Sequence, residues 1–404
     1  MKLTSANAFW ALSNGLKTTY PSVNEDIETD VVIIRAGITG GLIAHQCVSD
    51  GHRVVILDKR EVCHGSTSAT TSLLQYEIDV PLFKLIEKVG EEHAIASYKA
   101  CHRSIDIVEK LALDLSRDSG FKRKSSIYFC TKKGQLKALR KEFEVRKHYG
   151  FEVEWIMGNE LQNEYGLKGA LGAIRSAQGA SVDAYTLAYD LLAASVEKGL
   201  IVRDNTEVTK VEHDQDAVKV ITCDGHRLKA KKLIYCNGFE STEILGRSFV
   251  KLLSTYATVG EQLPGPETVL DDVLFWNMAD PYIYARATDD GRMLIGGEDE
   301  EFVDPQKRDR RIQKKAEKLE KTMHELFPKM PYKVDFAWAG TFGETEDGCP
   351  FIGEHKDHPN TYWVLGFGGN GITFSTIGRE MVSAYLSGQD HPMDEPWGFP
   401  GRFK

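Results

Sequence analysis

Two glycines and one carboxylate near the amino terminus have the spacing of a dinucleotide-binding turn. Gly37 and Gly40 occupy the second and third glycine positions of the pattern G-x-G-x-x-G, and Asp58 lies about 20 residues further on. Backbone N–H groups at the start of a helix attract a pyrophosphate, which can approach closely where side chains are absent. A carboxylate at position 58 can accept hydrogen bonds from ribose hydroxyls. This pattern predicts a dinucleotide site.

The first glycine position of the same pattern holds Arg35. Glycine there permits a tight turn as the chain leaves the strand, whereas arginine requires a costly backbone geometry or a relaxed turn. The Arg35 cation could assist the phosphates, or the substitution could weaken binding. We expect weakening, because backbone geometry rather than charge sets the turn.

The elements around the turn have the order that a Rossmann-type unit requires. A β-branched run at 30–34 predicts a buried strand, residues 42–48 have helical character, and 54–57 predicts a second buried strand that ends at Asp58. An isolated glycine turn in an unrelated α/β protein is the alternative, but it does not account for strand, turn, helix, strand and acid in register.

Two further stretches could contact a nucleotide. Ser66 and Thr67 offer hydroxyl groups to phosphates, although an ordinary turn or helix cap explains them equally well in isolation. The glycine-rich turn 366–371 precedes a helix, so its N–H groups could face the edge of a bound ring system where negative charge develops. A close-packed turn without a ligand is the alternative.

A substrate site is suggested by Tyr282-Ile-Tyr-Ala-Arg286, where the two tyrosines and the arginine share one face of a strand. A guanidinium flanked by phenols suits bidentate binding of a carboxylate. Salt bridges from Arg286 to Asp289 or Asp290 are an equal alternative.

Composition limits the class of protein. The chain has 404 residues, 42% of them hydrophobic, and a net charge of -9, which predicts more than one domain and no nucleic-acid partner. Its seven cysteines form no C-x-x-C pair, so we expect reduced thiols in the cytoplasm, with no metal site. We see no signal peptide and no transmembrane segment, and the sequence does not indicate an oligomeric state.

Together these motifs resemble the FAD-dependent oxidoreductases of the D-amino acid oxidase, glycine oxidase and sarcosine oxidase type. The resemblance runs from about Asp30 to Leu386. Four segments carry it: 30–40 through 58–60, 65–75, 235–238, and 345–353 followed by 366–373.

The resemblance implies an α/β fold in which a Rossmann-like FAD-binding domain is interleaved with an antiparallel-sheet α+β substrate domain. After an N-terminal extension (1–28), it assigns the FAD-binding domain to 29–81, 165–241 and 337–404, and the substrate domain to 82–164 and 242–336. The extension is expected to pack on the body through Trp10 and Tyr20.

The resemblance also implies the site residues. Those expected to bind FAD are Gly37, Thr39, Gly40, Asp58, Lys59, Ser66, Thr67, Leu74, Val208, Asn237, Gly238, Gly366, Gly368, Gly369, Asn370, Gly371, Ile372 and Thr373. Those expected to contact the substrate are Gln75, Tyr282, Tyr284 and Arg286. Ala69 and Gly340 stand where some relatives attach the flavin covalently, so we expect FAD to be non-covalent.

The implied activity is oxidation of a small amine or amino acid by hydride transfer to flavin N5. D-amino acid oxidases carry a carboxylate-binding arginine before the segment that begins at Thr345, and the stretch 338–344 has none. Either Arg286 replaces it, or Glu344 or Glu298 faces a cationic amine. The alternatives are a nicotinamide- or flavin-dependent dehydrogenase of a hydroxy acid, and a non-catalytic relative with a weakened FAD site.

Overall fold

The β-branched run before the glycine turn forms β1 (Ile27–Ile34), in which Val31–Ile33 are almost completely buried. Strands buried on both faces are typical of parallel sheets covered by helices. β1 indeed pairs in parallel with β2 (Val54–Leu57) and β10 (Arg227–Tyr235). The structure, a computed structural model, describes residues 2–115, 118–245, 249–263 and 269–402.

The first sheet has the strand order β16-β17-β10-β1-β2-β7, and a β8–β9 hairpin is attached to β10. The pairs β10–β17 and β2–β7 are parallel, and β16–β17 is antiparallel. The remaining strands of this sheet are β7 (Ile201–Arg203), β8 (Val208–His213), β9 (Val218–Thr222), β16 (Phe351–Glu354) and β17 (Thr361–Leu365).

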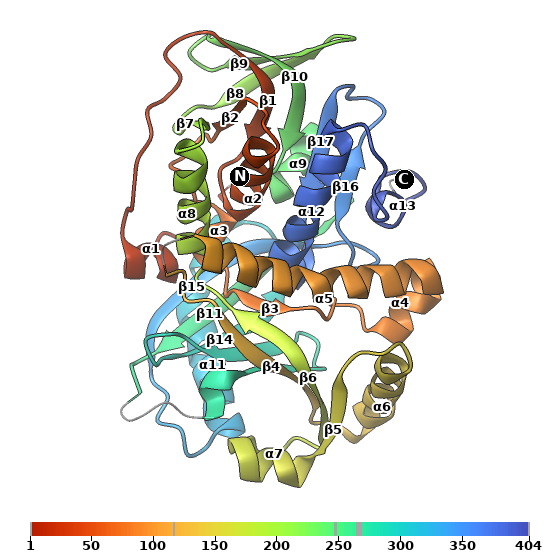
Figure 1. Ribbon diagram of the computed structural model, residues 1–404. Helices are drawn as coiled ribbons and strands as arrows, with labels where there is room; N and C mark the ends of the chain where they lie inside the picture. The colour runs from red at the N-terminus through yellow and green to blue at the C-terminus, as the bar shows by residue number, and fades with distance from the viewer. Residues whose placement is uncertain (1, 116–117, 246–248, 264–268, 403–404) are drawn as a thin grey trace.

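Three helices pack beside the first sheet: α2 (Ile38–Ser49) contacts both α8 (Ala184–Val196) and α12 (Gly371–Leu386). A long helix, α5 (Glu91–Asp114), packs on α12 and crosses between the two sheets (Figure 1). The preceding α4 (Leu82–Val89) is a separate helix, because Gly90 has φ +87° and turns the chain between them.

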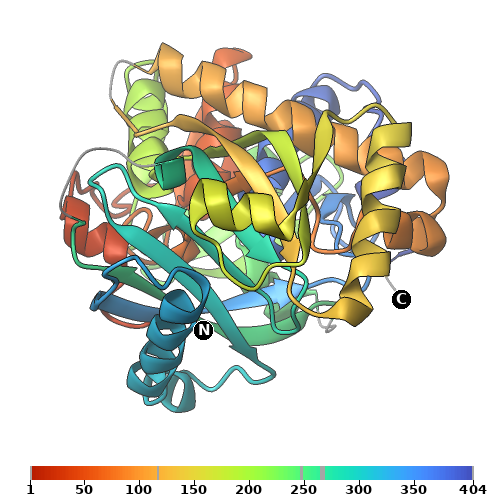
Figure 2. The ribbon, with the colours of Figure 1, turned by 90° about the horizontal axis from the view of Figure 1, so that it is seen from below.

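The second sheet has the order β15-β11-β14-β13-β12-β4-β6-β3, with β5 paired to β6. Its pairs are antiparallel except β12–β4, and seen from below its strands spread across the molecule (Figure 2). Its strands are β3 (Leu73–Gln75), β4 (Lys122–Cys130), β5 (Val153–Met157), β6 (Gly172–Ser181), β11 (Lys251–Gly260), β12 (Val273–Asn277), β13 (Ile283–Ala287), β14 (Met293–Glu300) and β15 (Val334–Glu344).

The other helices are α1 (Phe9–Asn14), α3 (Ser66–Ala69), α6 (Lys133–His148), α7 (Gly158–Tyr165), α9 (Ser241–Ile244), α10 (Pro305–Asp309), α11 (Ile312–Leu326) and α13 (Asp394–Trp397). Short 3-10 helices are η1 (Gly238–Glu240), η2 (Val269–Asp272) and η3 (Gly368–Asn370). Within the described ranges, no helix combines the length and apolar character needed to cross a bilayer.

Sheet pairing bears on the predicted domain boundaries. β3, β6 and most of β15 pair in the second sheet, although the boundaries placed these residues with the FAD-binding domain. Local sequence pattern shows that a strand exists but does not identify its partner, which register across the sheet decides. The two-domain division remains a proposal, and in it these three strands move to the substrate domain.

Candidate active site

A large cavity lies between the two sheets. The carboxyl ends of β1, β2, β10 and β17 border it on one side, and β11, β13 and β15 border it on the other. The predicted residues that line it are Gly37, Thr39, Asp58, Ser66, Thr67, Gln75, Asn237, Gly238, Tyr282, Tyr284, Gly366, Gly368, Gly369, Gly371 and Ile372. The crevice outside the carboxyl ends of parallel strands is where open α/β sheets bind nucleotides.

Seven predicted residues do not line this cavity: Gly40, Lys59, Leu74, Val208, Arg286, Asn370 and Thr373. Gly40 has a packing role, because a Cβ there would lie 1.9 Å from the Arg35 carbonyl oxygen. Val208 begins β8 and pairs with Thr222. Leu74 is buried, and Thr373 donates to the Asn370 carbonyl.

The glycine turn places the start of α2 at the cavity. Gly37 is the residue before the helix, and a Cβ on it would come within 2.8 Å of Thr67 Oγ1. The Ile38 N–H donates to the same hydroxyl at 3.0 Å, which fixes α3 against the amino terminus of α2. A side chain at Gly37 would displace Thr67, so glycine here keeps α3 packed against the start of α2, where a pyrophosphate is expected to bind.

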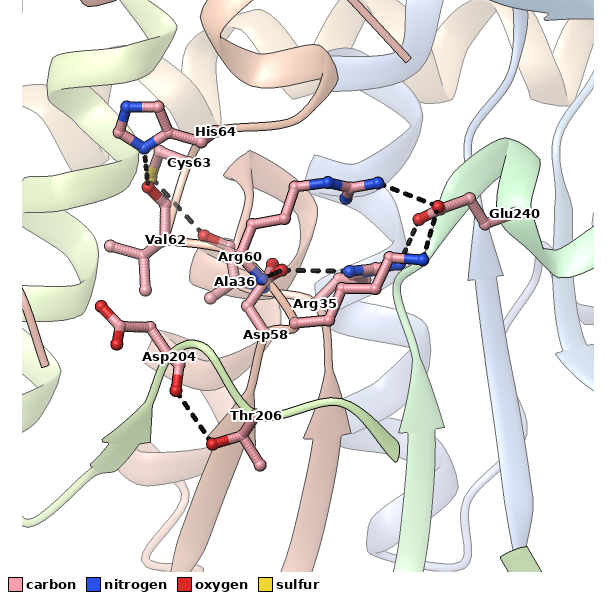
Figure 3. A network of polar contacts seen from close by, with 11 residues as sticks. Arg35, Ala36, Asp58, Arg60, Val62, Cys63, His64, Asp204, Thr206 and Glu240 are labelled. Carbon is pink, nitrogen blue, oxygen red and sulfur yellow. Dashed lines mark hydrogen bonds and ion pairs between the residues drawn. The ribbon is translucent and has the colours of Figure 1, made fainter. Parts of the chain in front are cut away.

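Arg35 crosses the carboxyl ends of three adjacent strands (Figure 3). Its Nη1 donates to Asp58 Oδ1 at 3.0 Å, and its Nη2 pairs with Glu240 beyond β10. Asp58 Oδ1 also accepts the Arg60 N–H, and its Oδ2 accepts the Ala36 N–H at 2.9 Å. The carboxylate expected to hold the ribose is thus already engaged by Arg35.

Glu240 also forms ion pairs with the other cationic side chains at this end of the cavity. Lys59 Nζ and Arg60 Nη2 each lie 3.0 Å from its Oε1. Burial alone would raise the pKa of Glu240, but Arg35, Arg60 and Lys59 outweigh it and lower the pKa to about 2. Glu240 is therefore charged at neutral pH, and it holds Arg35 in the adenosine end of the cavity. Sequence reasoning missed Glu240, which lies in η1, far along the chain from Arg35.

The opposite end of the cavity has the features of a ring-binding site. η3 and the start of α12 form the glycine-rich turn, and a Cβ on Gly366 would meet the Gly371 carbonyl oxygen at 2.9 Å. Asn370 Nδ2 donates to the Gln75 and Glu77 carbonyl oxygens at 3.0 Å, which ties this turn to β3. Asn237 lines the cavity with a buried Oδ1 that has no hydrogen-bond partner among the residues that the structure describes. The pyrophosphate and flavin regions therefore fit FAD, whereas the adenosine region fits it only if Arg35 moves.

Acidic and phenolic side chains surround the end of the cavity beside this turn. Asp79 lines it and accepts the Gly369 N–H at 2.8 Å on Oδ2. Tyr282 and Tyr284 line it from β13 and the residue before it, with ring centroids 5.7 Å apart. A Cβ on Gly369 would lie 3.5 Å from the Tyr282 hydroxyl, so Asp79, Gly369 and Tyr282 meet at one point.

Two more carboxyl groups act on this end electrostatically. Burial raises the pKa of Asp299 to about 7 and outweighs a hydrogen bond with Thr255 that lowers it, while the Glu344 and Asp79 charges raise it further. Burial and the Asp79 charge also raise the pKa of Glu344. Among the described residues that line the cavity, the arginines are Arg35 and Arg60, at the adenosine end. The acidic end therefore has a field that favours a cation.

Glu298 does not contribute to that field at the cavity. Its Oε2 lies 3.0 Å from both Lys315 Nζ and Lys318 Nζ, on the α11 side of β14. Burial acts to raise the pKa of Glu298, but the two lysines outweigh it and lower the pKa. Of the two glutamates suggested for an amine, Glu344 is the one coupled to Asp79.

The structure does not support Arg286 as a carboxylate clamp. Arg286 shares a face with Tyr284, as the alternation predicted, but its side chain is only 1% exposed and lies outside the cavity lining. Its Nε donates to the Thr71 carbonyl at 2.8 Å, and its guanidinium lies 5.5 Å from the ring of Trp10. The N-terminal segment thus covers the position at which a substrate carboxylate was expected.

We accordingly expect Arg286→Met to change stability rather than substrate binding. Loss of a buried charge-assisted hydrogen bond costs about 1.5–3 kcal/mol, so the melting temperature should fall while KM changes less than about twofold, because this side chain meets no ligand. Thermal unfolding and steady-state kinetics measure the two effects. A strong increase in KM with a normal flavin spectrum would instead indicate that Arg286 binds the substrate carboxylate.

The two positions considered for covalent attachment lie together in the structure. A Cβ added to Gly340 would be 4.0 Å from the Ala69 Cβ, and Gly340 and Ala69 both line the cavity. Neither residue has a nucleophilic side chain. Non-covalent binding of the cofactor stays a prediction, which acid precipitation of the FAD-loaded protein would test.

Known proteins resemble the chain over most of its length. Residues 30–384 match the family model described as FAD dependent oxidoreductase. The glycine oxidase of Geobacillus kaustophilus is 24% identical, over 90% of this chain and 94% of its own. The gamma-glutamylputrescine oxidoreductase of Escherichia coli K12 is 22% identical, over 96% of this chain and 90% of its own.

The fold has a solved counterpart. The crystal structure of glycine oxidase from Geobacillus kaustophilus matches with a TM-score of 0.76 and 20% sequence identity. The match covers 92% of this chain and 98% of the other, so it includes both sheets. The α/β architecture predicted from the sequence is confirmed.

Proposed function

We propose that this chain, which belongs to the FAD-dependent oxidoreductase family and uses FAD, oxidises a cationic amine at the C–H bond next to nitrogen. The observation that carries the proposal is the acidic end of the cavity, where Asp79 lies beside Tyr282 and the glycine-rich turn. An ammonium group can donate charge-assisted hydrogen bonds to a carboxylate placed in this way. Two of its relatives are named for an amino acid and an amine substrate.

The residues at this end have separable tasks in the proposed reaction. Bound FAD would supply the hydride acceptor. Asp79, held by the Gly369 N–H, would accept a hydrogen bond from the substrate nitrogen, and Tyr282 and Tyr284 would enclose the carbon chain. The ammonium would first lose a proton to water, because only the neutral amine has the lone pair that assists loss of hydride. The hydride would pass to bound FAD, and water would hydrolyse the iminium product.

A substrate screen on the FAD-loaded protein tests the proposal. Under anaerobic conditions, loss of the flavin absorbance is expected with monoamines and diamines, faster than with glycine or D-alanine. Bleaching by hydroxy acids alone would overturn the amine assignment. A protein that binds FAD but is bleached by none of these compounds would favour a non-catalytic relative.

The rate should depend on pH through Asp299. Because its pKa is about 7, the carboxyl group is neutral below that pH and charged above it. The kcat/KM for a cationic amine should therefore rise between pH 6 and 8, since the added charge attracts the cation. Asp299→Asn should flatten this rise without altering the flavin spectrum. An unchanged pH profile in the variant would contradict the assignment.

A further inference from the structure

The first residues of the chain form an extra strand at the edge of the second sheet. The Ser5 N–H donates to the Ala339 carbonyl at 2.9 Å, and the Thr341 N–H donates to the Leu3 carbonyl at 2.8 Å. Thr4 lies opposite Gly340 in an antiparallel bridge. Residues 3–5 therefore continue the sheet beyond β15, its edge strand.

Buried side chains fix this segment to the body at two places. Arg308, with no exposed surface, donates from Nη1 to the Lys2 and Leu3 carbonyls at 3.2 and 3.1 Å, and to Thr341 Oγ1 at 2.9 Å. Further along, Trp10 is buried and donates from Nε1 to the Thr70 carbonyl at 2.6 Å. The extension thus packs on the body through Trp10, as the sequence predicted.

The segment forms part of the cavity wall. Leu3 and Thr4 line the cavity between β15 and the loop that begins at Gly65. A Cβ on Gly65 would lie 3.9 Å from Leu3 Cδ1, and a Cβ on Gly340 would lie 3.8 Å from the Leu3 carbonyl oxygen. Leu3 therefore closes the gap between these two glycines.

Packing behind the segment is incomplete. A second, smaller cavity is bordered by Lys2–Ala6 together with Arg60, His64 and Ser68. The segment is paired to one strand on one side and borders open space on another. Segments that are packed on one side only can open at a fraction of the cost of global unfolding.

We propose that Leu3–Ser5 form a strap that retains FAD by closing the cavity wall, and that release of this strap opens a route for the cofactor. The proposal rests on FAD occupying the cavity, as in the proposed function. It does not depend on which substrate is oxidised, because the strap contacts the wall beside Gly65 and Gly340 rather than the acidic end. Leu3 supplies the apolar closure, and Arg308 positions its backbone.

The test compares FAD release from three variants loaded with FAD in the absence of any amine. One lacks residues 2–5, the second is Leu3→Gly, and the third is Leu16→Gly. Leu16 is a matched control, because it lies in the same N-terminal extension but is 56% exposed. The rate is followed by the rise in free-FAD fluorescence after dilution, and thermal unfolding without FAD reports on folding.

The truncated chain should release FAD about tenfold faster, and Leu3→Gly several-fold faster, because affinity changes at a fixed site appear mainly in dissociation rates. Leu16→Gly should match the unaltered protein. If the truncated chain does not fold, the FAD release rate of Leu3→Gly alone tests the proposal. Release rates equal to that of the unaltered protein would overturn the strap, and amine oxidation could still be intact.

Discussion

Replacing Arg35 with glycine is expected to tighten FAD binding about tenfold or more, equivalent to at least 1.4 kcal/mol. The cause is occupation of Asp58: its Oδ1 is held by Arg35 and its Oδ2 by the Ala36 N–H. A ribose hydroxyl must displace the guanidinium before it can reach Oδ1. In Arg35→Gly the guanidinium is gone and Oδ1 retains the Arg60 N–H, so a ribose hydroxyl can reach this oxygen. Glu240 keeps Lys59 and Arg60 as partners.

Backbone strain at Arg35 has a separate effect, on stability rather than on FAD affinity. Arg35 has φ +90°, in the region that favours glycine, and a non-glycine residue there costs about 1–3 kcal/mol. Glycine removes this cost in the free and the bound protein alike, so it should raise thermal stability without FAD as well as with it. Loss of the ion pairs to Asp58 and Glu240 opposes part of the gain.

Arg35→Ala separates the effect on FAD affinity from the effect on stability, because alanine removes the guanidinium but keeps a Cβ at the same φ. If occupation of Asp58 limits binding, Arg35→Ala should tighten FAD binding nearly as much as Arg35→Gly, and only Arg35→Gly should gain stability without FAD. The measurement is a titration of all three proteins with FAD at low and high salt. Weaker binding by Arg35→Gly, with a loss that shrinks at high salt, would make Arg35 a phosphate ligand.

Local pattern was sufficient for the cofactor side of the site. The run at 30–34, the turn at Gly37 and the acid at Asp58 lie within one βαβ unit, so sequence spacing alone brings them together. Glu240 is brought to Arg35 by the parallel pairing of β1 with β10, across some 200 residues. Local periodicity therefore could not predict that Glu240 pairs with Arg35.

The substrate side was harder to predict for the same reason. Alternation along β13 correctly placed Tyr284 and Arg286 on one face, but it does not say where along that face the cavity ends. Trp10 and Thr71, from distant parts of the chain, decide that Arg286 lies outside it. Asp79 lies just after the predicted Gln75 in the sequence, but nothing in the local pattern marks it as a site residue. Its position in the cavity depends on the contact between the end of β3 and the glycine-rich turn, which are far apart in the sequence.

Asp79→Asn is expected to raise KM for a cationic amine tenfold to more than a hundredfold, with a smaller change in kcat. The range follows from the loss of a charge-assisted hydrogen bond, which is worth about 1.5–3 kcal/mol. Asparagine has nearly the same shape, and its Oδ1 can still accept the Gly369 N–H that Asp79 accepts now. The turn beside the flavin should therefore keep its geometry, and the flavin spectrum should stay the same.

Asp280→Asn is the matched control for this prediction. Asp280 is an exposed carboxylate two residues before Tyr282, so its replacement makes the same change in net charge outside the cavity. Its KM should stay within about twofold of the unaltered protein, because exposed charges are strongly screened. Equal KM increases in the two variants would indicate a general charge effect. If the KM of Asp79→Asn does not increase while FAD binds normally, Asp79 does not bind the substrate. The proposed amine would then have no identified carboxylate partner at this end of the cavity.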